Sequence, residues 1–400
     1  MKVLIVSQYF WPENFRINDL AVGLGERGHE VTVLTGIPNY PHGRFFPGYG
    51  LYKKTREEYK GVRIVRVPLI PRGKGNRIMM ALNYLSFTLS AIIIAPFRCR
   101  GKFDLIFVCQ LSPVTVGLPA LLLKKIKRVP VIFWILDLWP ESLSATGAIH
   151  SPSILKMMDA LVRLIYRGCD KIIVSSRGFM SSVAEKLDNP ARLDYFPNWQ
   201  EPEYSGAATI TEYLPEGFLV VFAGNIGVAQ DFETIVSVAE KLKGYRDIQW
   251  VILGDGGRLD WVKAQVELRK LSASFHLKGR YPSEAMPAFF AQADLMLVTL
   301  KRDPAFALTV PGKIQSYMAC GRPIVAALDG EGGQLITESG CGLSVPAEDV
   351  DALADAVLTM YRMPKEQREE MGKRGKSFCE VNFEREKLMD RLEVWMSELA

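Results

Sequence analysis

The chain has 400 residues, of which 48% are hydrophobic and 23% are charged, and its formal net charge is +5. This length and composition predict a globular protein of two domains and exclude a disordered or fibrous chain. The modest charge, without interleaved aromatic and basic residues, argues against nucleic-acid binding. Six widely separated cysteines without a CxxC pair predict reduced thiols and a cytoplasmic location.

Short β-branched segments alternate with helical patterns from the N-terminus onward. Strands are predicted in the first half at residues 2–6, 30–35, 62–67, 104–109, 131–136 and 171–175. Between the first two, Ile17, Leu20, Ala21 and Leu24 repeat at helical spacing, and Gly28 ends the helix. This alternation predicts a parallel sheet with helices on both faces.

Residues 78–97 form a nearly continuous apolar segment, about as long as a membrane span. Cations flank it on both sides, namely Arg72, Lys74, Arg77, Arg98, Arg100 and Lys102. Asn83 and other polar residues interrupt it, so a buried core helix and a helix lying on the membrane surface are both favoured over a true span. The surface helix predicts a peripheral protein on the inner face of the cytoplasmic membrane.

The strand–helix pattern restarts after a stretch rich in proline and glycine at 197–217. Further strands are predicted at 219–223, 248–253, 274–277, 294–298, 322–326 and 342–345. We therefore predict two α/β, Rossmann-like domains that face each other across a cleft. Their predicted bounds are 1–197, a linker at 198–217, and 218–383, followed by a helix at 384–400 that packs on either domain.

Ligands of open parallel sheets bind beyond the carboxyl ends of the strands, so the loops there are candidates for chemistry. After the first strand, Asn14 and Arg16 stand where a helix begins, although Asn14 is equally interpreted as a helix cap. After the second strand, a stiff loop containing Asn39, Tyr40 and His42 is predicted to contact substrate. His42 is a candidate general base, with an ordinary surface histidine as the alternative.

Two carboxylates follow the fifth strand. Asp137 comes directly after a buried apolar run and is surrounded by aromatic residues, so an altered pKa and acid–base work are predicted for it. Capping of a turn is the alternative. Glu141, four residues later, is a weaker candidate of the same kind.

Consecutive loops of the second half carry glycines or cations. Glycines permit close approach of the backbone to a phosphate, and lysines and arginines neutralise it. A Pro-Gly turn before Lys313 adds a helix start to this set. The residues predicted to bind a nucleotide diphosphate are Gly224, Asn225, Gly227, Gly254, Asp255, Arg280, Lys301, Val310, Pro311, Lys313 and Ser316. No metal-binding motif is found, and Asp349 is interpreted as a helix cap.

Four segments together resemble the retaining glycosyltransferases of family 4, which have the GT-B fold. They are residues 27–33 (RGHEVTV), 223–227 (AGNIG), 253–256 (LGDG) and 310–323 (VPGKIQSYMACGRP). Residues 137–142 and 38–41 look most similar to the L-fucosamine transferase subgroup of surface-polysaccharide enzymes. The resemblance implies a nucleotide-sugar donor in the C-terminal domain, an acceptor in the N-terminal domain held near Asn14, Arg16, Asn39 and Tyr40, and no metal.

The chain departs from that family at three places. Leu308 and Ser316 stand where the family has a pair of glutamates. Asn225 and Gln230 occupy the neighbourhood of its usual arginine and lysine, and Asp137 lies where a histidine is often found. Lys301, Lys313 and helix N-termini are therefore expected to neutralise the diphosphate.

These observations predict a retaining glycosyltransferase without cofactor or metal. It would move N-acetyl-L-fucosamine or a related deoxyhexosamine from a UDP donor to a polyprenyl-diphosphate-linked glycan, in O-antigen or capsule synthesis. Two alternatives stay open: a GT-B nucleotide-sugar epimerase, and a non-catalytic nucleotide-binding protein at the membrane.

Overall fold

The structure is a computed structural model that describes residues 1–73, 77–147, 149, 151–199 and 214–400. Lys74 and most of the predicted linker at 198–217 lie outside the described residues. The chain divides into two compact units. Unit 1 comprises residues 1–197 and 386–400, and unit 2 comprises residues 198–385.

Unit 1 is built on an eight-stranded sheet with the order β3-β4-β2-β1-β5-β6-β7-β8. Its strands are β1 (Lys2–Val6), β2 (Glu30–Gly36), β3 (Arg56–Tyr59), β4 (Val62–Val67), β5 (Leu105–Gln110), β6 (Val131–Ile135), β7 (Lys171–Val174) and β8 (Leu193–Tyr195). Its helices are α1 (Arg16–Glu26), α2 (Arg77–Arg98), α3 (Gly117–Lys127), α4 (Glu141–Ala145), α5 (Pro152–Gly168), α6 (Phe179–Ala184) and α15 (Arg385–Leu399).

The sheet of unit 1 differs from the prediction at both edges. β3 pairs antiparallel with β4, whereas the other pairings are parallel. β3 and β8 were not predicted, because β3 is a short charged segment (REEY) and β8 has three residues. The central strands β5 and β6 are buried along their whole length, which explains why they read as continuous apolar runs.

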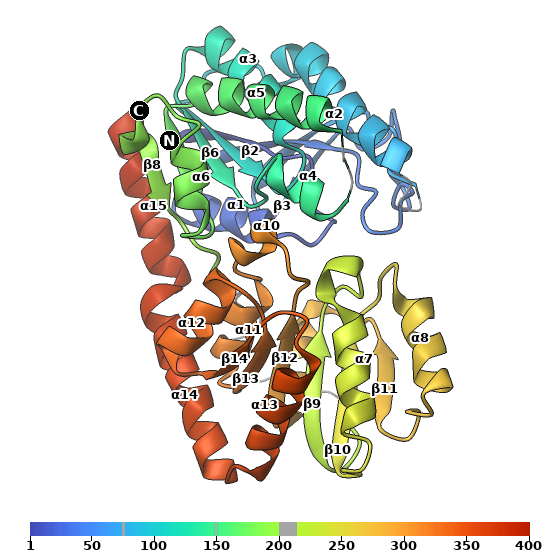
Figure 1. The fold of residues 1–400 in the computed structure, drawn as a ribbon. Coiled ribbons are helices and arrows are strands. Elements are labelled where there is room, and N and C mark those ends of the chain that lie inside the picture. The colour runs from blue at the N-terminus through green and yellow to red at the C-terminus, as the bar shows by residue number, and fades with distance from the viewer. Residues whose placement is uncertain (74–76, 148, 150, 200–213) are drawn as a thin grey trace. The chain divides into compact units, whose positions relative to one another are not determined.

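Helices α2, α3 and α5 lie along one side of the unit 1 sheet (Figure 1). One face of α2 is buried, with Asn83, Phe87, Thr88, Ala91 and Ala95 following helical spacing. The opposite face of α2 is apolar and exposed. By length and composition α2 could cross a membrane, and it is the one such helix among the residues described. The apolar segment is thus a packed helix of unit 1 with one uncovered face.

The C-terminal helix α15 packs on unit 1 through a cluster of charges. Arg27 donates to Asp390 and Glu393 at 2.6 Å each and to Glu386 at 2.6 Å. His29 lies 2.7 Å from the other carboxylate oxygen of Glu393. The chain therefore returns to unit 1 after it has completed unit 2.

Unit 2 is built on a six-stranded parallel sheet with the order β11-β10-β9-β12-β13-β14. Its strands are β9 (Phe218–Ala223), β10 (Ile248–Leu253), β11 (Phe275–Gly279), β12 (Leu295–Thr299), β13 (Ile324–Ala327) and β14 (Gly342–Val345). Its helices are α7 (Phe232–Lys241), α8 (Leu259–Leu268), α9 (Met286–Gln292), α10 (Pro304–Ala307), α11 (Lys313–Ala319), α12 (Glu331–Ser339), α13 (Val350–Arg362) and α14 (Lys365–Asn382).

The sheet of unit 2 has an apolar core on each face. Along β9, Val220 and Phe222 belong to the core under α7, α8 and α13. Val221 and Ala223 belong to the core under α9, α11 and α14. This alternation follows from the two-residue period of a strand. β9 ends at Ala223, and the next residue, Gly224, begins a loop at the carboxyl end of this central strand.

Candidate functional site

The strand order of unit 2 reverses direction between β9 and β12, and such a switch point is where open α/β sheets bind ligands. The Gly224 and Gly254 turns, which follow β9 and β10, interlock there. Gly224 has a φ of 139° and Gly254 a φ of 152°. A Cβ atom at Gly254 would overlap the carbonyl oxygen of Gly224. Only glycine fits this close approach of two backbones, so the loops form one rim.

The polar side chains of this rim mainly hold the rim itself. Asn225 donates to Gln230 at 3.3 Å, and the amide of Gly227 donates to the same Gln230 oxygen at 3.2 Å. Asp255 is exposed and accepts the amide of Gly256 at 2.7 Å. Asn225, Gly227 and Asp255 thus shape the loops that were predicted to bind a diphosphate.

Lys313, the first residue of α11, directs its amine toward this rim. Its Nζ lies 3.7 Å from the centre of the Phe222 ring, and a Cβ atom at Gly224 would lie 3.2 Å from it. The amine is buried and donates to no acceptor in the part of the chain that the structure describes. Burial lowers the pKa of Lys313 to about 7, because removal from water disfavours the ammonium. An anion at the Gly224 turn would supply the missing partner.

Lys301 follows β12, on the other side of the switch point. Its amide donates to Ala229 at 2.9 Å, and its Nζ lies 3.8 Å from Glu233. Glu233 also pairs with Arg258, whose guanidinium lies 4.2 Å from the centre of the Trp261 ring. Lys301 is therefore a half-buried cation that shares a carboxylate. The sequence did not single out the pairing of Arg258 with Glu233, because Arg258 stands directly before α8 and belongs to no recognisable motif.

The segment before α11 lies against the beginning of α12. A Cβ atom at Gly332 would lie 3.2 Å from the ring of Pro311, so the two segments approach closely. The amide of Ile314 is already donated to Pro311 at 2.9 Å, which reduces the number of free amides expected at this turn. Val310 is partly exposed, whereas Ser316 is buried. Arg280, after β11, is exposed.

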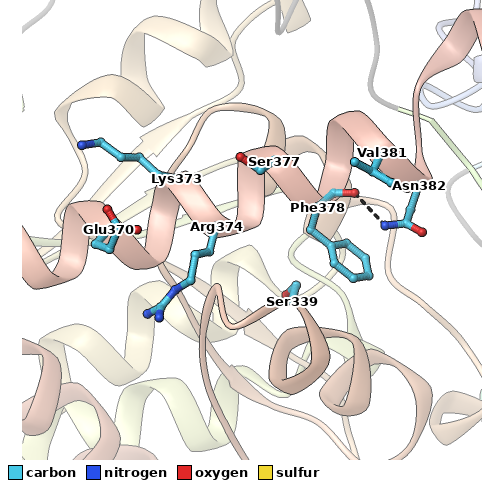
Figure 2. Close-up of a pocket in the computed structure, with 8 residues that line it drawn as sticks. All are labelled: Ser339, Glu370, Lys373, Arg374, Ser377, Phe378, Val381 and Asn382. Atoms are coloured by element: carbon cyan, nitrogen blue, oxygen red, sulfur yellow. Dashed lines mark hydrogen bonds between the residues drawn. The ribbon is translucent and has the colours of Figure 1, made fainter.

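Unit 2 has two surface pockets of similar size. One, of about 440 Å³, lies where β13 ends and is lined by residues that include Asp329, Gly330 and Gln334. The other, of about 420 Å³, is lined by Ser339 and α14 residues, among them Lys373 and Arg374 (Figure 2). None of the predicted donor residues lines either pocket, so we assign no role to them.

In unit 1 the strand order reverses between β1 and β5. Gln8 follows β1 and Gln110 ends β5. β1 and β5 are neighbours in the sheet, so both glutamines stand at the carboxyl ends of adjacent strands. The Nε2 of Gln8 donates to Asn83 at 2.7 Å, and that of Gln110 to the carbonyl of Asp137 at 2.7 Å. Both Oε1 atoms are buried and accept nothing from the described residues. Two orphaned acceptors at a switch point fit a bound water or hydroxyl group.

The loop predicted to contact substrate is organised by Glu13, which the sequence did not single out. One carboxylate oxygen of Glu13 accepts the amides of Asn39 and Tyr40 at 2.7 Å each. Burial raises the pKa of Glu13 to about 7 against the effect of these bonds. Asn39 is itself buried and accepts the amide of Arg72 at 3.0 Å, so it holds the loop in place. Tyr40 is partly exposed, and Arg72 lies 5.1 Å from its ring centre.

Asp137 follows β6 and is close to the orphaned acceptor of Gln110. Its Oδ2 accepts the indole N–H of Trp139 at 2.8 Å. Burial raises the pKa of Asp137, opposed by hydrogen bonds from Ser142, Trp139 and Ser112. The altered pKa that the sequence predicted is present, and its cause is desolvation.

The remaining residues predicted for unit 1 are either paired with other side chains or lie at the surface. Glu141 forms an ion pair with Lys186 and accepts the hydroxyl of Ser182 at 2.8 Å, which joins α4 to α6. A catalytic role for Glu141 stays a prediction. His42 is exposed, with its ring 6.0 Å from that of Phe46. Asn14 is exposed and is not the cap of α1, because Phe15 takes the N-cap position. Arg16 is the first residue of α1.

Among the described residues, no group of three or more histidine, cysteine, aspartate or glutamate side chains is arranged to hold a metal ion. Metal-independence stays a prediction. Asp349 caps α13 by accepting the amide of Ala352 at 2.9 Å, so its interpretation as a cap is confirmed.

Both units match known families of glycosyltransferases. Residues 14–199 match the family described as Glycosyl transferase 4-like domain, and residues 217–363 match Glycosyl transferases group 1. The "Putative colanic acid biosynthesis glycosyl transferase WcaI" of Escherichia coli (strain K12) is 26% identical over 388 residues, covering 91% of this chain and 93% of that protein. The "Probable glycosyltransferase WbjE" of Pseudomonas aeruginosa is 30% identical over 298 residues, covering 71% and 72%.

Solved structures show the same fold at low identity. Anabaena Alr3699/HepE in complex with UDP is 15% identical with a TM-score of 0.72, and all of both chains is covered. Sucrose-phosphate synthase from Thermosynechococcus elongatus is 16% identical with a TM-score of 0.76, covering 100% of this chain and 98% of that one. The predicted fold of two α/β domains of the GT-B class is thereby confirmed.

Proposed function

The chain belongs to the group 1 glycosyltransferases with a glycosyltransferase 4-like N-terminal domain, and on this premise we propose that it transfers a sugar from a UDP carrier to a lipid-linked glycan with retention of configuration. Membership of the family gives the class of enzyme. The nucleotide, the sugar, the acceptor and the stereochemistry are parts of the proposal.

The observation that carries the donor assignment is the buried, unpartnered amine of Lys313 beside the Gly224 turn. A charge-assisted hydrogen bond to a phosphate oxygen would satisfy it. Gly224 and Gly254 lack side chains that would cover the approach, and Lys301 adds a second cation at the same switch point. Anabaena Alr3699/HepE, which has a similar fold, was crystallised in complex with UDP, and this supports a uridine nucleotide here.

In this proposal the chemistry is mainly electrostatic. Charge develops on the leaving diphosphate in the transition state, and Lys313 and Lys301 would stabilise it without moving. The acceptor would lie in unit 1, with its hydroxyl groups donating to the orphaned oxygens of Gln8 and Gln110. Asp137 would touch the reacting hydroxyl, since its buried carboxylate follows the adjacent strand. Glu13 acts by positioning Asn39 and Tyr40.

We take the sugar to be an N-acetylated deoxyhexosamine, such as N-acetyl-L-fucosamine. Residues 137–142 and 38–41 resemble the L-fucosamine transferases of surface-polysaccharide synthesis. The name of the relative WcaI refers to colanic acid biosynthesis, which supports a role in polysaccharide synthesis. A polyprenyl-diphosphate-linked glycan is the acceptor that such synthesis requires in this proposal.

A lipid-linked acceptor stays in the membrane, and unit 1 carries a surface suited to dock there. We call this surface the apolar helix face. Its α2 side chains are each between 40% and 69% exposed, and three more lie on α5, which is in the same helical layer. The residues are Ile78, Leu82, Leu85, Leu89, Ile93 and Phe97 on α2, and Ile154, Met157 and Leu164 on α5.

Cations near the apolar helix face favour an anionic bilayer as the partner. Arg77 and Arg100 are exposed, and Lys102 is exposed just beyond the end of α2. Arg98 also forms a structural hydrogen bond, because its guanidinium donates to the carbonyl of Arg66 at 2.6 Å. A charge-reversal test should therefore use Arg100 and Lys102 and leave Arg98 intact.

Calorimetric titration with UDP and GDP tests the donor assignment. Wild-type protein should bind UDP, and Lys313→Ala and Lys301→Ala should each weaken binding, by about 1.5–3 kcal/mol for Lys313 as a lost charge-assisted bond. Lys263→Ala, an exposed lysine on α8, is a matched control that should leave affinity unchanged. Unchanged UDP affinity in both test variants would remove the proposed donor site.

A further inference from the structure

The amine of Lys313 lies beside an aromatic ring and a glycine turn, and within the described part of the chain it forms no ion pair. Its surroundings are the Phe222 ring and the Gly224 turn, neither of which carries an ionisable group. Burial is the cause of its depressed pKa, with no charged neighbour contributing. The face of the Phe222 ring attracts an ammonium, which offsets part of the desolvation cost. Burial still lowers the pKa of Lys313, so the free protein carries less positive charge here than the sequence implies.

Ionisable groups on the bordering elements are engaged elsewhere. Tyr317 of α11 exchanges two hydrogen bonds with the backbone of Ala223, at 3.0 and 3.1 Å. Asp255 accepts the amide of Gly256. Glu233 of α7 pairs with Arg258 and Lys301. Asp231, at the start of α7, is buried, and its pKa is raised by burial. Within the described residues, none of these groups forms a hydrogen bond or ion pair with Lys313.

We propose that Lys313 is mainly an uncharged amine in the free protein above neutral pH, and that it takes up a proton from solution when a nucleotide diphosphate binds at the Gly224 turn. The inference rests on the donor site proposed above. The neutral –NH₂ group gains a proton from the buffer and becomes –NH₃⁺, which donates to a phosphate oxygen. The proton returns to solution when the nucleotide leaves.

Proton uptake makes donor affinity depend on pH in a defined direction. Half of the free amines are protonated near pH 7, and roughly one in eleven at pH 8. UDP affinity should therefore fall about fivefold from pH 7 to pH 8, and about tenfold per pH unit above that. The terminal phosphate of UDP titrates near pH 6, so it is about nine-tenths ionised at pH 7 and almost fully ionised at pH 8, and its own titration contributes little to the fall.

Calorimetry with UDP at pH 8, in HEPES, Tricine and Tris buffers, measures the uptake directly. The slope of observed enthalpy against the ionisation enthalpy of the buffer gives the number of protons bound. Wild-type protein should take up most of one proton per UDP. Lys313→Met, which places an apolar side chain beside the Phe222 ring, should bind UDP more weakly and take up none. Lys301→Met is the matched control, with weaker binding and unchanged uptake.

The possible results separate this inference from the donor assignment. UDP binding by the wild type without proton uptake would overturn the inference and leave the donor site standing. Uptake that persists in Lys313→Met would overturn it as well, because another group would be the source. No UDP binding by the wild type would overturn both proposals. Lys313→Gln, for which zero uptake is also expected, serves if the methionine variant does not fold.

Discussion

Replacing two exposed apolar residues of α2 should release the protein from membranes while leaving its fold intact. Leu89 and Ile93 are 58% and 64% exposed on the apolar helix face. Full burial of such a side chain contributes about 1.5–3 kcal/mol. Docking of the exposed three-fifths of both side chains should therefore contribute about 2–3.5 kcal/mol. A helix at the interface is only partly immersed, so Leu89→Ser with Ile93→Ser should weaken liposome binding about tenfold or more.

Flotation with liposomes of mixed anionic and neutral lipid measures this change. Leu268→Ser with Val381→Ser is the matched control, because these residues of unit 2 are 73% and 67% exposed but lie outside the apolar helix face. The control should bind liposomes as the wild type does. Charge reversal at Arg100 and Lys102 should weaken binding most at low salt, because salt screens exposed charges. Failure of the wild type to bind anionic liposomes, or equal binding by the serine variant, would refute the docking surface.

Three further predictions concern the two sites. Asp137→Asn should lower kcat on the order of 100-fold with unchanged UDP affinity, and near-normal turnover in steady-state assays would make Asp137 structural. Gly254→Ala should weaken UDP binding and lower the Tm, because its Cβ overlaps the carbonyl of Gly224, whereas Gly257→Ala has open space and should change neither in parallel titrations and melts. Burial raises the pKa of Glu13 from 4.5 to about 7, so the folded protein holds a proton that the unfolded chain releases over that range. The free energy of unfolding should accordingly fall as pH rises from about 4.5 to 7, and Glu13→Gln should flatten that part of a urea-denaturation series; an unchanged slope would contradict the assignment.

Apolar patterning was sufficient to predict the strands that lie inside each sheet. β1, β4 and β10 have the bounds predicted for them, because each is rich in apolar and β-branched residues and is buried over most of its length. β3 could not be found in this way, since an antiparallel edge strand buries little and its charged sequence resembles a loop. The amino-acid sequence therefore indicates a strand mainly where the strand is buried and is rich in apolar residues.

Site residues could be predicted where the backbone conformation requires a particular residue type. They were harder to predict where the role of a side chain depends on its burial and its contacts in the folded protein. The glycines at 224 and 254 stand out in the sequence because tight turns require them. Lys313 was identified as a cation, but the absence of a partner for its amine comes from packing against Phe222. Glu13 gave no signal, since its role depends on the amides of Asn39 and Tyr40, far along the chain. Glu141 was predicted without its ion pair, because Lys186, just after α6, is far from it along the chain.

Transfer of a sugar to a lipid-linked acceptor tests the central claim most directly. Purified protein would be incubated with UDP-linked N-acetylated deoxyhexosamines and a polyprenyl-diphosphate-sugar, and the products analysed by mass spectrometry and NMR. The account predicts an acceptor heavier by one sugar residue, a product linkage with the anomeric configuration of the donor, and loss of product in Asp137→Asn. Conversion of the donor without any change in the acceptor would indicate an epimerase, and UDP binding without turnover of any donor would indicate a binding protein; either result would contradict the account.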